Sequence, residues 1–143
     1  MATDTINKFN NFVDELGNAE HDLGGADVLK FALTNTLPTA ADANWNLTSH
    51  PAPAAANGYT AGGNTISKTY TETGGVGTLA LSADSVFTAT AGGIGPFQYV
   101  VLYNSSSTTP TNAGIGWYDY GSSITLADTE TFTISAGTIL TIT

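Results

Sequence analysis

From Thr65 to the end, the sequence consists of short segments that alternate apolar and polar residues between turns. A period of two places successive side chains on opposite faces of a β-strand. The segments lie at 66–71, 79–81, 86–89, 98–103, 115–120, 123–126, 131–135 and 138–143, and glycine pairs such as Gly74-Gly75 and Gly92-Gly93 interrupt them. With residues 29–34 this gives about eight or nine strands at spacings of roughly 8–12 residues. We therefore predict a mainly β chain: an antiparallel β-sandwich or jelly-roll-like domain with one short N-terminal α-helix. The spacing alone does not choose between jelly-roll and immunoglobulin-like strand orders.

Two of the expected strands should differ in burial. Residues 98–103 (QYVVLY) form the most continuously apolar run, which predicts a central strand covered on both faces. Residues 29–34 alternate Leu29, Phe31 and Leu33 with smaller or polar residues, which predicts a strand buried on one face only.

The N-terminal segment predicts the helix, at residues 4 to about 17. Asp4 or Thr5 can cap its start, and Gly17 with Asn18 can end it. Its apolar residues are Ile6, Phe9, Val13 and Leu16 at 3-4-3 spacing, with Phe12 beside them. Because so short a helix is marginal alone, this stripe must dock on something. It packs either on the chain's own β domain or, as an arm, on a neighbouring subunit. We accordingly divide the chain into an N-terminal helix or arm at 1–25 and a single β-sandwich domain at 26–143.

Residues 36–64 predict a long loop. They contain Pro38, Pro51 and Pro53, an alanine run at 54–56, and the turn signals Asn57-Gly58 and Gly62-Gly63. Loops of this length in compact domains usually serve function or assembly. The alternative is one short edge strand at 44–48 followed by an irregular connection.

Composition excludes several classes of function. The 143 residues suit one domain, and the lack of cysteine excludes disulfides, zinc–thiolate sites and thiol catalysis. Three lysines, no arginine and twelve acids give a net charge of −9, which disfavours nucleic acid and anionic membrane surfaces as partners. No segment reaches the ~20 apolar residues of a membrane span. The first residues lack the apolar core of a secretory signal, so we expect the chain to be intracellular when made.

Candidate catalytic residues do not form a recognisable constellation. We expect His21 and His50 to be solvated, since His21 cannot share a metal with its sequence neighbours Glu20 and Asp22 on one helix face. The sequence has no G-x-S-x-G elbow, and no Lys-Ser/Thr follows the glycine runs at 74–77 and 92–95 as in a phosphate loop; we expect these runs to be turns. The acids outside the N-terminal segment that could serve a cleft, Asp84, Asp119, Asp128 and Glu130, all stand in turn or outward-facing contexts. We therefore expect no enzymatic activity, no catalytic residue, no metal site and no cofactor.

The densest aromatic cluster, WYDY at 117–120, has two interpretations. Alternation places Trp117 and Asp119 on one face of a strand, and Tyr118 and Tyr120 on the other. We expect Trp117 in the core and Asp119 at its rim, bonded to turn backbone near Gly121. The alternative is an exposed Trp117 that binds sugars.

Several runs resemble small structural proteins of tailed bacteriophages. The runs are NGYTAGG at 57–63, GPFQYVVLYN at 95–104 and residues 114–134, together with INKFN at 6–10 and residues 29–36. They occur in the same order along nearly the whole chain, and they are packing and turn motifs without catalytic residues.

The resemblance implies a capsid decoration (cement) protein that binds across capsomers and stabilises the shell. The alternatives are a tail, connector or glycan-binding host-recognition module of the virion. The implied partners are the major capsid protein and further copies of the chain, in a homotrimer, with no nucleic acid or membrane. The implied location is the capsid exterior, after synthesis in the host cytoplasm. The candidate assembly contacts are Ile6, Phe9, Phe12, Val13, Leu16, Pro51, Pro53 and Tyr59.

Overall fold

The computed structural model describes residues 6–46 and 48–143 and shows a mainly β domain with one short helix. This confirms the predicted fold class. In chain order the elements are β1 (Asn7–Lys8), α1 (Asn11–Gly17), β2 (Leu29–Thr34), β3 (Asn64–Thr65), β4 (Lys68–Thr73), β5 (Val76–Leu81), β6 (Ser85–Thr88), β7 (Ile94–Thr108), β8 (Thr111–Leu126), β9 (Thr131–Ile134) and β10 (Gly137–Ile142).

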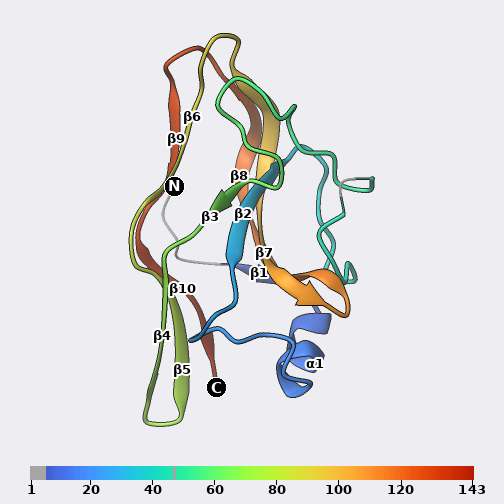
Figure 1. Ribbon diagram of the computed structural model, residues 1–143, viewed down its shortest axis with the longest axis vertical. Helices are drawn as coiled ribbons and strands as arrows, with labels where there is room; N and C mark the ends of the chain where they lie inside the picture. The colour runs from blue at the N-terminus through green and yellow to red at the C-terminus, as the bar shows by residue number, and fades with distance from the viewer. Residues whose placement is uncertain (1–5, 47) are drawn as a thin grey trace.

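The strands form two layers of antiparallel sheet. One layer is a five-stranded sheet in the order β1-β8-β7-β2-β3. The other contains the three-stranded sheet β10-β5-β4 and, beyond it, the ribbon β6-β9. Figure 1 shows β2, β7 and β8 on the right and the smaller sheets on the left, with β3 leading across into β4. The arrangement is sandwich-like.

The main hydrophobic core lies between the two layers. Phe31, Leu33 and Leu102 from the larger sheet and Leu79 and Phe87 from the smaller ones are all fully buried in it. Burial of apolar surface on this scale is the dominant favourable term in folding, so the facing of the two layers stabilises the domain.

A second apolar cluster covers the outer face of the larger sheet. It comprises Phe9, Ala32, Trp45, Tyr99, Val101, Tyr103 and Trp117. Residues 98–103 are therefore covered on both faces, as predicted. The one-sided burial expected for β2 is wrong, because Ala32 and Thr34 are also fully buried. Their cover includes Trp45 and Ala52, from the loop between β2 and β3.

The helix is shorter than the sequence indicates. It begins at Asn11, and Asn7 and Lys8 instead pair with β8 as β1. The expected caps at residues 4 and 5 lie outside the described residues. The apolar stripe expected from the sequence is therefore not the face that the helix buries. The buried helical residues are Phe12 and Glu15, whereas Val13 is 57% exposed. The helix packs against β8 of its own chain.

The segment between β2 and β3 is a long loop, shown in teal and green at the right and top of Figure 1. Within it Asn44 forms an isolated bridge with Ala113 of β8, in place of the alternative strand at 44–48. In the part of the chain that the structure describes, no helix is long and apolar enough to cross a membrane.

Candidate functional site

The eight candidate assembly residues do not form one surface. Phe9, Phe12 and Tyr59 are buried within the chain, Ile6, Leu16 and Pro53 are partly buried, and only Val13 and Pro51 are exposed. Phe9 packs on Trp117, with ring centroids 4.9 Å apart. The buried residues hold the fold together, so they present little surface to another subunit.

Three of the eight residues do come together in the long loop. Pro51, Pro53 and Tyr59 line a mostly apolar pocket of about 250 Å³, and the other lining residues are Ala52, Ala55, Ala61 and Gly62. No Asp, Glu, Lys or Arg occurs between Asp42 and Lys68. We call residues 51–62 the loop face; it is an uncharged surface with an apolar hollow.

The loop face is fixed to the larger sheet by tyrosine hydroxyls. The Tyr59 hydroxyl accepts a hydrogen bond from the Leu33 amide (3.1 Å), and the Tyr103 hydroxyl donates one to the Gly62 carbonyl (2.7 Å). Burial raises the pKa of Tyr59 to about 12 and also raises that of Tyr103. The two hydroxyl bonds hold the loop face against β2 and β7 in the free chain.

Backbone geometry explains the last glycine of the NGYTAGG run. Gly63 has φ of +84°, and a Cβ there would collide with the Phe31 carbonyl oxygen. Only glycine allows this close approach of the loop to β2. Thr34 adds a further tie through its hydroxyl, which donates to the Pro51 carbonyl (3.0 Å).

The expectation of two solvated histidines is wrong. His50 is 6% exposed; it stacks on Trp45, and its Nε2 lies 3.1 Å from Asp42 Oδ2. His50 therefore ties itself to Asp42 and Trp45 within the first half of the long loop. His21 is 7% exposed and belongs to a polar network beneath α1.

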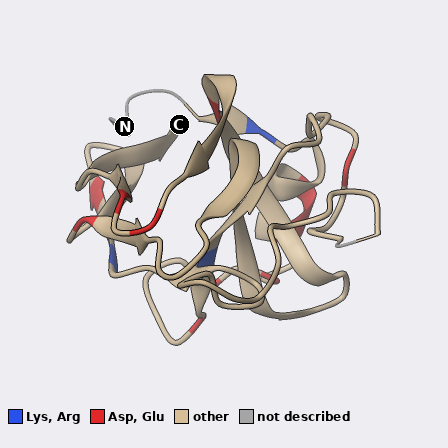
Figure 2. Cartoon of the chain, turned by 90° about the horizontal axis from the view of Figure 1, so that it is seen from above, with Lys and Arg blue, Asp and Glu red and all other residues tan. Residues whose placement is uncertain are grey.

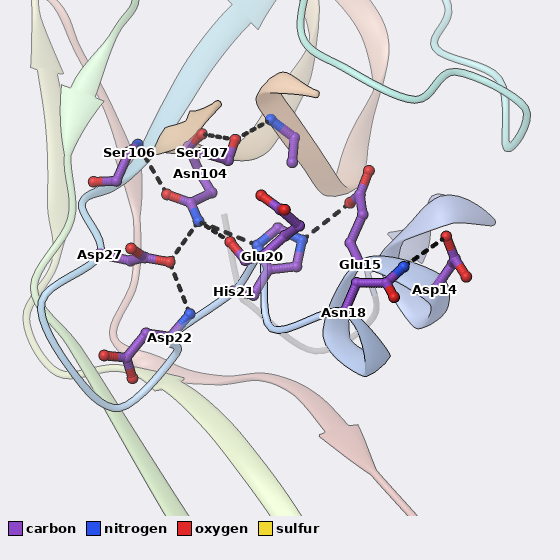
Figure 3. Close-up of polar contacts among 11 residues, drawn as sticks. Asp14, Glu15, Asn18, Glu20, His21, Asp22, Asp27, Asn104, Ser106 and Ser107 are labelled. Atoms are coloured by element: carbon purple, nitrogen blue, oxygen red, sulfur yellow. Dashed lines mark hydrogen bonds and ion pairs between the residues drawn. The ribbon is translucent and has the colours of Figure 1, made fainter. Parts of the chain in front are cut away.

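The network joins the segment after α1 to β7 (Figure 3). His21 Nε2 lies 3.1 Å from Glu15 Oε2, and His21 Nδ1 lies 3.3 Å from the amide nitrogen of Asn104. The same Asn104 nitrogen donates to Asp27 Oδ2 (2.6 Å) and to the Glu20 carbonyl (3.0 Å). Because that nitrogen can only donate, His21 Nδ1 accepts and Nε2 carries the proton that it donates to Glu15.

Burial controls the protonation of this pair. It raises the pKa of Glu15 to about 7, with smaller contributions from Glu20 and Asp14. Burial lowers the pKa of His21, against the opposing effect of Asp27. The bonds of His21 to Glu15 and Asn104 tie α1 and the segment after it to β7 of the larger sheet.

Sequence reasoning missed this network because its members are distant. Glu15 and His21 are six residues apart, which is not a spacing of one helix face. They meet because α1 ends at Gly17 and the chain turns at Ala19, whose φ is +60°. Asn104 lies 83 residues further along. No local pattern signals the network, because Phe12, whose ring centroid lies 5.2 Å from that of His21, is itself nine residues away in the sequence.

The interpretation of the aromatic cluster is confirmed. Trp117 is 9% exposed, and Asp119 Oδ1 accepts from the Gly121 amide (2.7 Å) and from Gln98 (2.9 Å). The buried indole offers no platform for a sugar, which removes the basis of the glycan alternative at this position.

The other candidate acids bond to backbone amides. Asp84 accepts from Ala136, Asp128 from Ala91, and Glu130 from Ala127, each at 2.7 Å. Among residues 6–46 and 48–143, no three His, Asp or Glu side chains lie where they could hold one metal ion. These acids act as turn anchors.

Comparison with known proteins gives no relative: no family model, no curated protein and no solved structure matches this chain.

Proposed function

We propose that this chain is a non-enzymatic structural protein of a tailed-phage virion, a capsid decoration protein that binds the major capsid protein across capsomer junctions. The observation that carries the proposal is the loop face: a preformed, uncharged surface with an apolar hollow lined by Pro51, Pro53 and Tyr59. Its NGYTAGG run is also one of the motifs that resemble phage structural proteins.

The physical case rests on the cost of association. Ordering long charged side chains and desolvating polar groups both oppose binding, and the loop face carries no charged side chain. Prolines and buried tyrosine bonds fix it before binding, so little conformational entropy is lost. Cement copies seated on neighbouring capsomers would oppose the outward pressure of packaged DNA.

The charge distribution suits the outside of a particle. Figure 2 shows acidic residues spread over several parts of the domain and few cations, in keeping with the net charge of −9. Such a surface repels DNA. The homotrimer implied by the resemblance remains part of the proposal, and light scattering measures it directly.

The test uses expanded, DNA-free shells of the phage that encodes the chain. Purified protein should co-sediment with the shells and raise their disruption temperature. Ala55→Asp places a charge in the hollow and should weaken binding at least about ten-fold, because the carboxylate must be desolvated. Ala83→Asp adds the same charge in the turn between β5 and β6 and should bind normally.

Failure of the wild-type chain to bind shells would reject the capsid role, and rings in solution would favour a connector or tail-tube subunit. Equal weakening by both variants would show a general effect of charge and would remove the loop face from the interface.

A further inference from the structure

The smaller sheet has an open edge at strand β4. The order β10-β5-β4 gives β4 a neighbour on one side only among the described residues. Residues 69–73 are all exposed, and the hairpin of β4 and β5 protrudes from the lower end of the molecule in Figure 1. An exposed edge strand presents unpaired N–H and C=O groups, which pair readily with another strand.

Hydrogen bonds at the start of β4 show which backbone groups face the open edge. The Ser67 carbonyl accepts from Ser82, which follows β5, whereas the Ile66 amide donates to Leu29 on the other side. Backbone direction alternates along a strand. The odd-numbered residues of β4 therefore bond to β5, and the even-numbered residues point their N–H and C=O groups to the open edge.

The sequence of β4 is complementary to itself in the antiparallel direction. Residues 68–72 read KTYTE. If Tyr70 faces Tyr70 of a second copy, Lys68 of each copy faces Glu72 of the other, and Thr69 faces Thr71. Opposite charges and threonine pairs are favourable across antiparallel strands. The Tyr70 ring lies over Gly77 of β5 in its own chain, so the centre of this contact is made by backbone bonds. We propose that two copies of this chain associate by antiparallel β4–β4 pairing centred on Tyr70, which joins their three-stranded sheets into one.

Backbone and charge together select this register. The even-numbered residues must face one another, so the other two-fold registers are centred on Thr71, Glu72, Thr69 or Lys68. The Thr69 register leaves Glu72 opposite Ile66, and the Lys68 register places two ammonium groups together. The Thr71 register leaves Lys68 opposite Gly74, and the Glu72 register places two Glu72 carboxylates together. Only the Tyr70 register pairs both charges.

The two charged groups retain bonding capacity for the second copy. The Lys68 ammonium has three hydrogens and donates to the Leu23 carbonyl (2.7 Å) and the Gly25 carbonyl (3.1 Å). Glu72 accepts from the Gly75 amide through Oε1 (2.6 Å), and its second oxygen faces no described partner. One ammonium hydrogen and one carboxylate oxygen are thus left for each of the two cross-strand ion pairs.

This contact is two-fold, so it is distinct from the trimer implied by the phage resemblance. It also uses β4 rather than the loop face. The experiments below use the purified chain in solution, and their outcome is independent of whether it binds a capsid.

Charge reversal tests the pairing. The wild-type chain should show a concentration-dependent monomer–dimer equilibrium by sedimentation or by light scattering after size exclusion. Glu72→Lys and Lys68→Glu each place like charges opposite one another twice, and each should weaken homodimerisation at least about ten-fold. An equimolar mixture of the two variants restores both opposite-charge pairs and should form a heterodimer. Thermal melting checks that each variant folds.

The mixture separates the proposal from its competitors. A wild-type monomer at all concentrations, a trimer unaffected by either variant, or a mixture that fails to associate would each overturn it. Open-ended polymers would also do so, since they would indicate pairing of β4 with β10.

A cysteine pair tests the register. The chain has no cysteine, and Thr69 faces Thr71 at a non-hydrogen-bonded position, where Cα atoms lie about 4.5 Å apart, within disulfide range. The double variant Thr69→Cys/Thr71→Cys should form a covalent dimer on mild oxidation. Thr71→Cys alone is the control, because position 71 does not face itself. Equally rapid cross-linking of both proteins would exclude the Tyr70 register.

Discussion

At the scale of single residues, the pair of Glu15 and His21 gives the domain a definite pH dependence. The pKa of Glu15 is raised from 4.5 to about 7 in the folded state, chiefly by burial. The folded state therefore binds more protons than the unfolded state between these values. The contribution of Glu15 to the free energy of unfolding is complete below about pH 4.5 and is lost as the pH rises through 7. The lowered pKa of His21 acts oppositely: its contribution is present above pH 6.5 and is lost as the pH falls.

Replacing Glu15 by glutamine should isolate the first effect. Glu15→Gln keeps the shape of the side chain but does not ionise. Between pH 5 and 8 the free energy of unfolding of the wild-type protein should fall relative to the variant by about 2–3 kcal/mol. Urea unfolding at intervals of one pH unit measures this. Glu72→Gln, at an exposed position, should run parallel to the wild type. Parallel profiles for Glu15→Gln as well would show that Glu15 does not titrate in this range.

At the scale of elements, the Tyr59 hydroxyl is one of several ties that attach the long loop to the larger sheet. Tyr59→Phe removes the acceptor of the buried Leu33 amide while preserving the ring, which stacks on Phe87 at 5.9 Å. A buried donor without a partner costs about 1–3 kcal/mol, and we expect a loss of stability of that size in urea unfolding. Tyr120→Phe, at a 44% exposed tyrosine, should change stability little. Unchanged stability of Tyr59→Phe would show that the hydrogen bond to Leu33 contributes nothing and that ring packing and the bonds of Tyr103 and Thr34 hold the loop.

The elements that the sequence predicts well are those whose signal is local. Alternation and glycine turns predict the β-rich fold, and the continuous apolar run at 98–103 predicts a strand covered on both faces. The turn anchor at Asp119 is also local, because its carboxylate accepts a hydrogen bond from the amide of Gly121, two residues further along.

The elements that it predicts poorly depend on distant partners. Ala32 is buried because Trp45 and Ala52 of the loop cover it. The helix starts late because Asn7 and Lys8 pair with β8, at Trp117 and Gly116. The histidines are buried by side chains from other segments. Three of the candidate assembly residues, Pro51, Pro53 and Tyr59, meet in the loop face because hydrogen bonds of Tyr59 and Tyr103 fix it. These bonds join residues that are far apart in the sequence, so residue spacing does not predict them.

At the scale of the whole molecule, net charge opposes any association between copies. Each copy carries −9, and repulsion between two such bodies acts over the Debye length, which falls from ~30 Å at 0.01 M salt to ~8 Å at 0.15 M. The two cross-strand ion pairs of the proposed dimer are exposed, and such pairs contribute only about 0–1 kcal/mol each. Added salt screens both the repulsion between the two net charges and the attraction within the two ion pairs, but the long-range repulsion is the larger effect.

Dimerisation through β4 should therefore strengthen as salt increases, with the dissociation constant falling several-fold between 10 and 150 mM NaCl. The doubly exchanged variant Lys68→Glu/Glu72→Lys has the same net charge of −9 and the same pairing, so its salt dependence should match that of the wild type. Sedimentation equilibrium at three salt concentrations measures both. Weaker dimerisation at higher salt would mean that ion pairs dominate the contact.

Net charge also distinguishes a specific contact from a general one. Glu72→Lys changes the net charge from −9 to −7, since −9 + 2 = −7, so repulsion between whole molecules decreases while the local contact at β4 becomes repulsive. If overall charge governed association, this variant would dimerise more strongly than the wild type. The Tyr70 register requires the reverse at every salt concentration, because two lysines then face each other at each end of the paired strands.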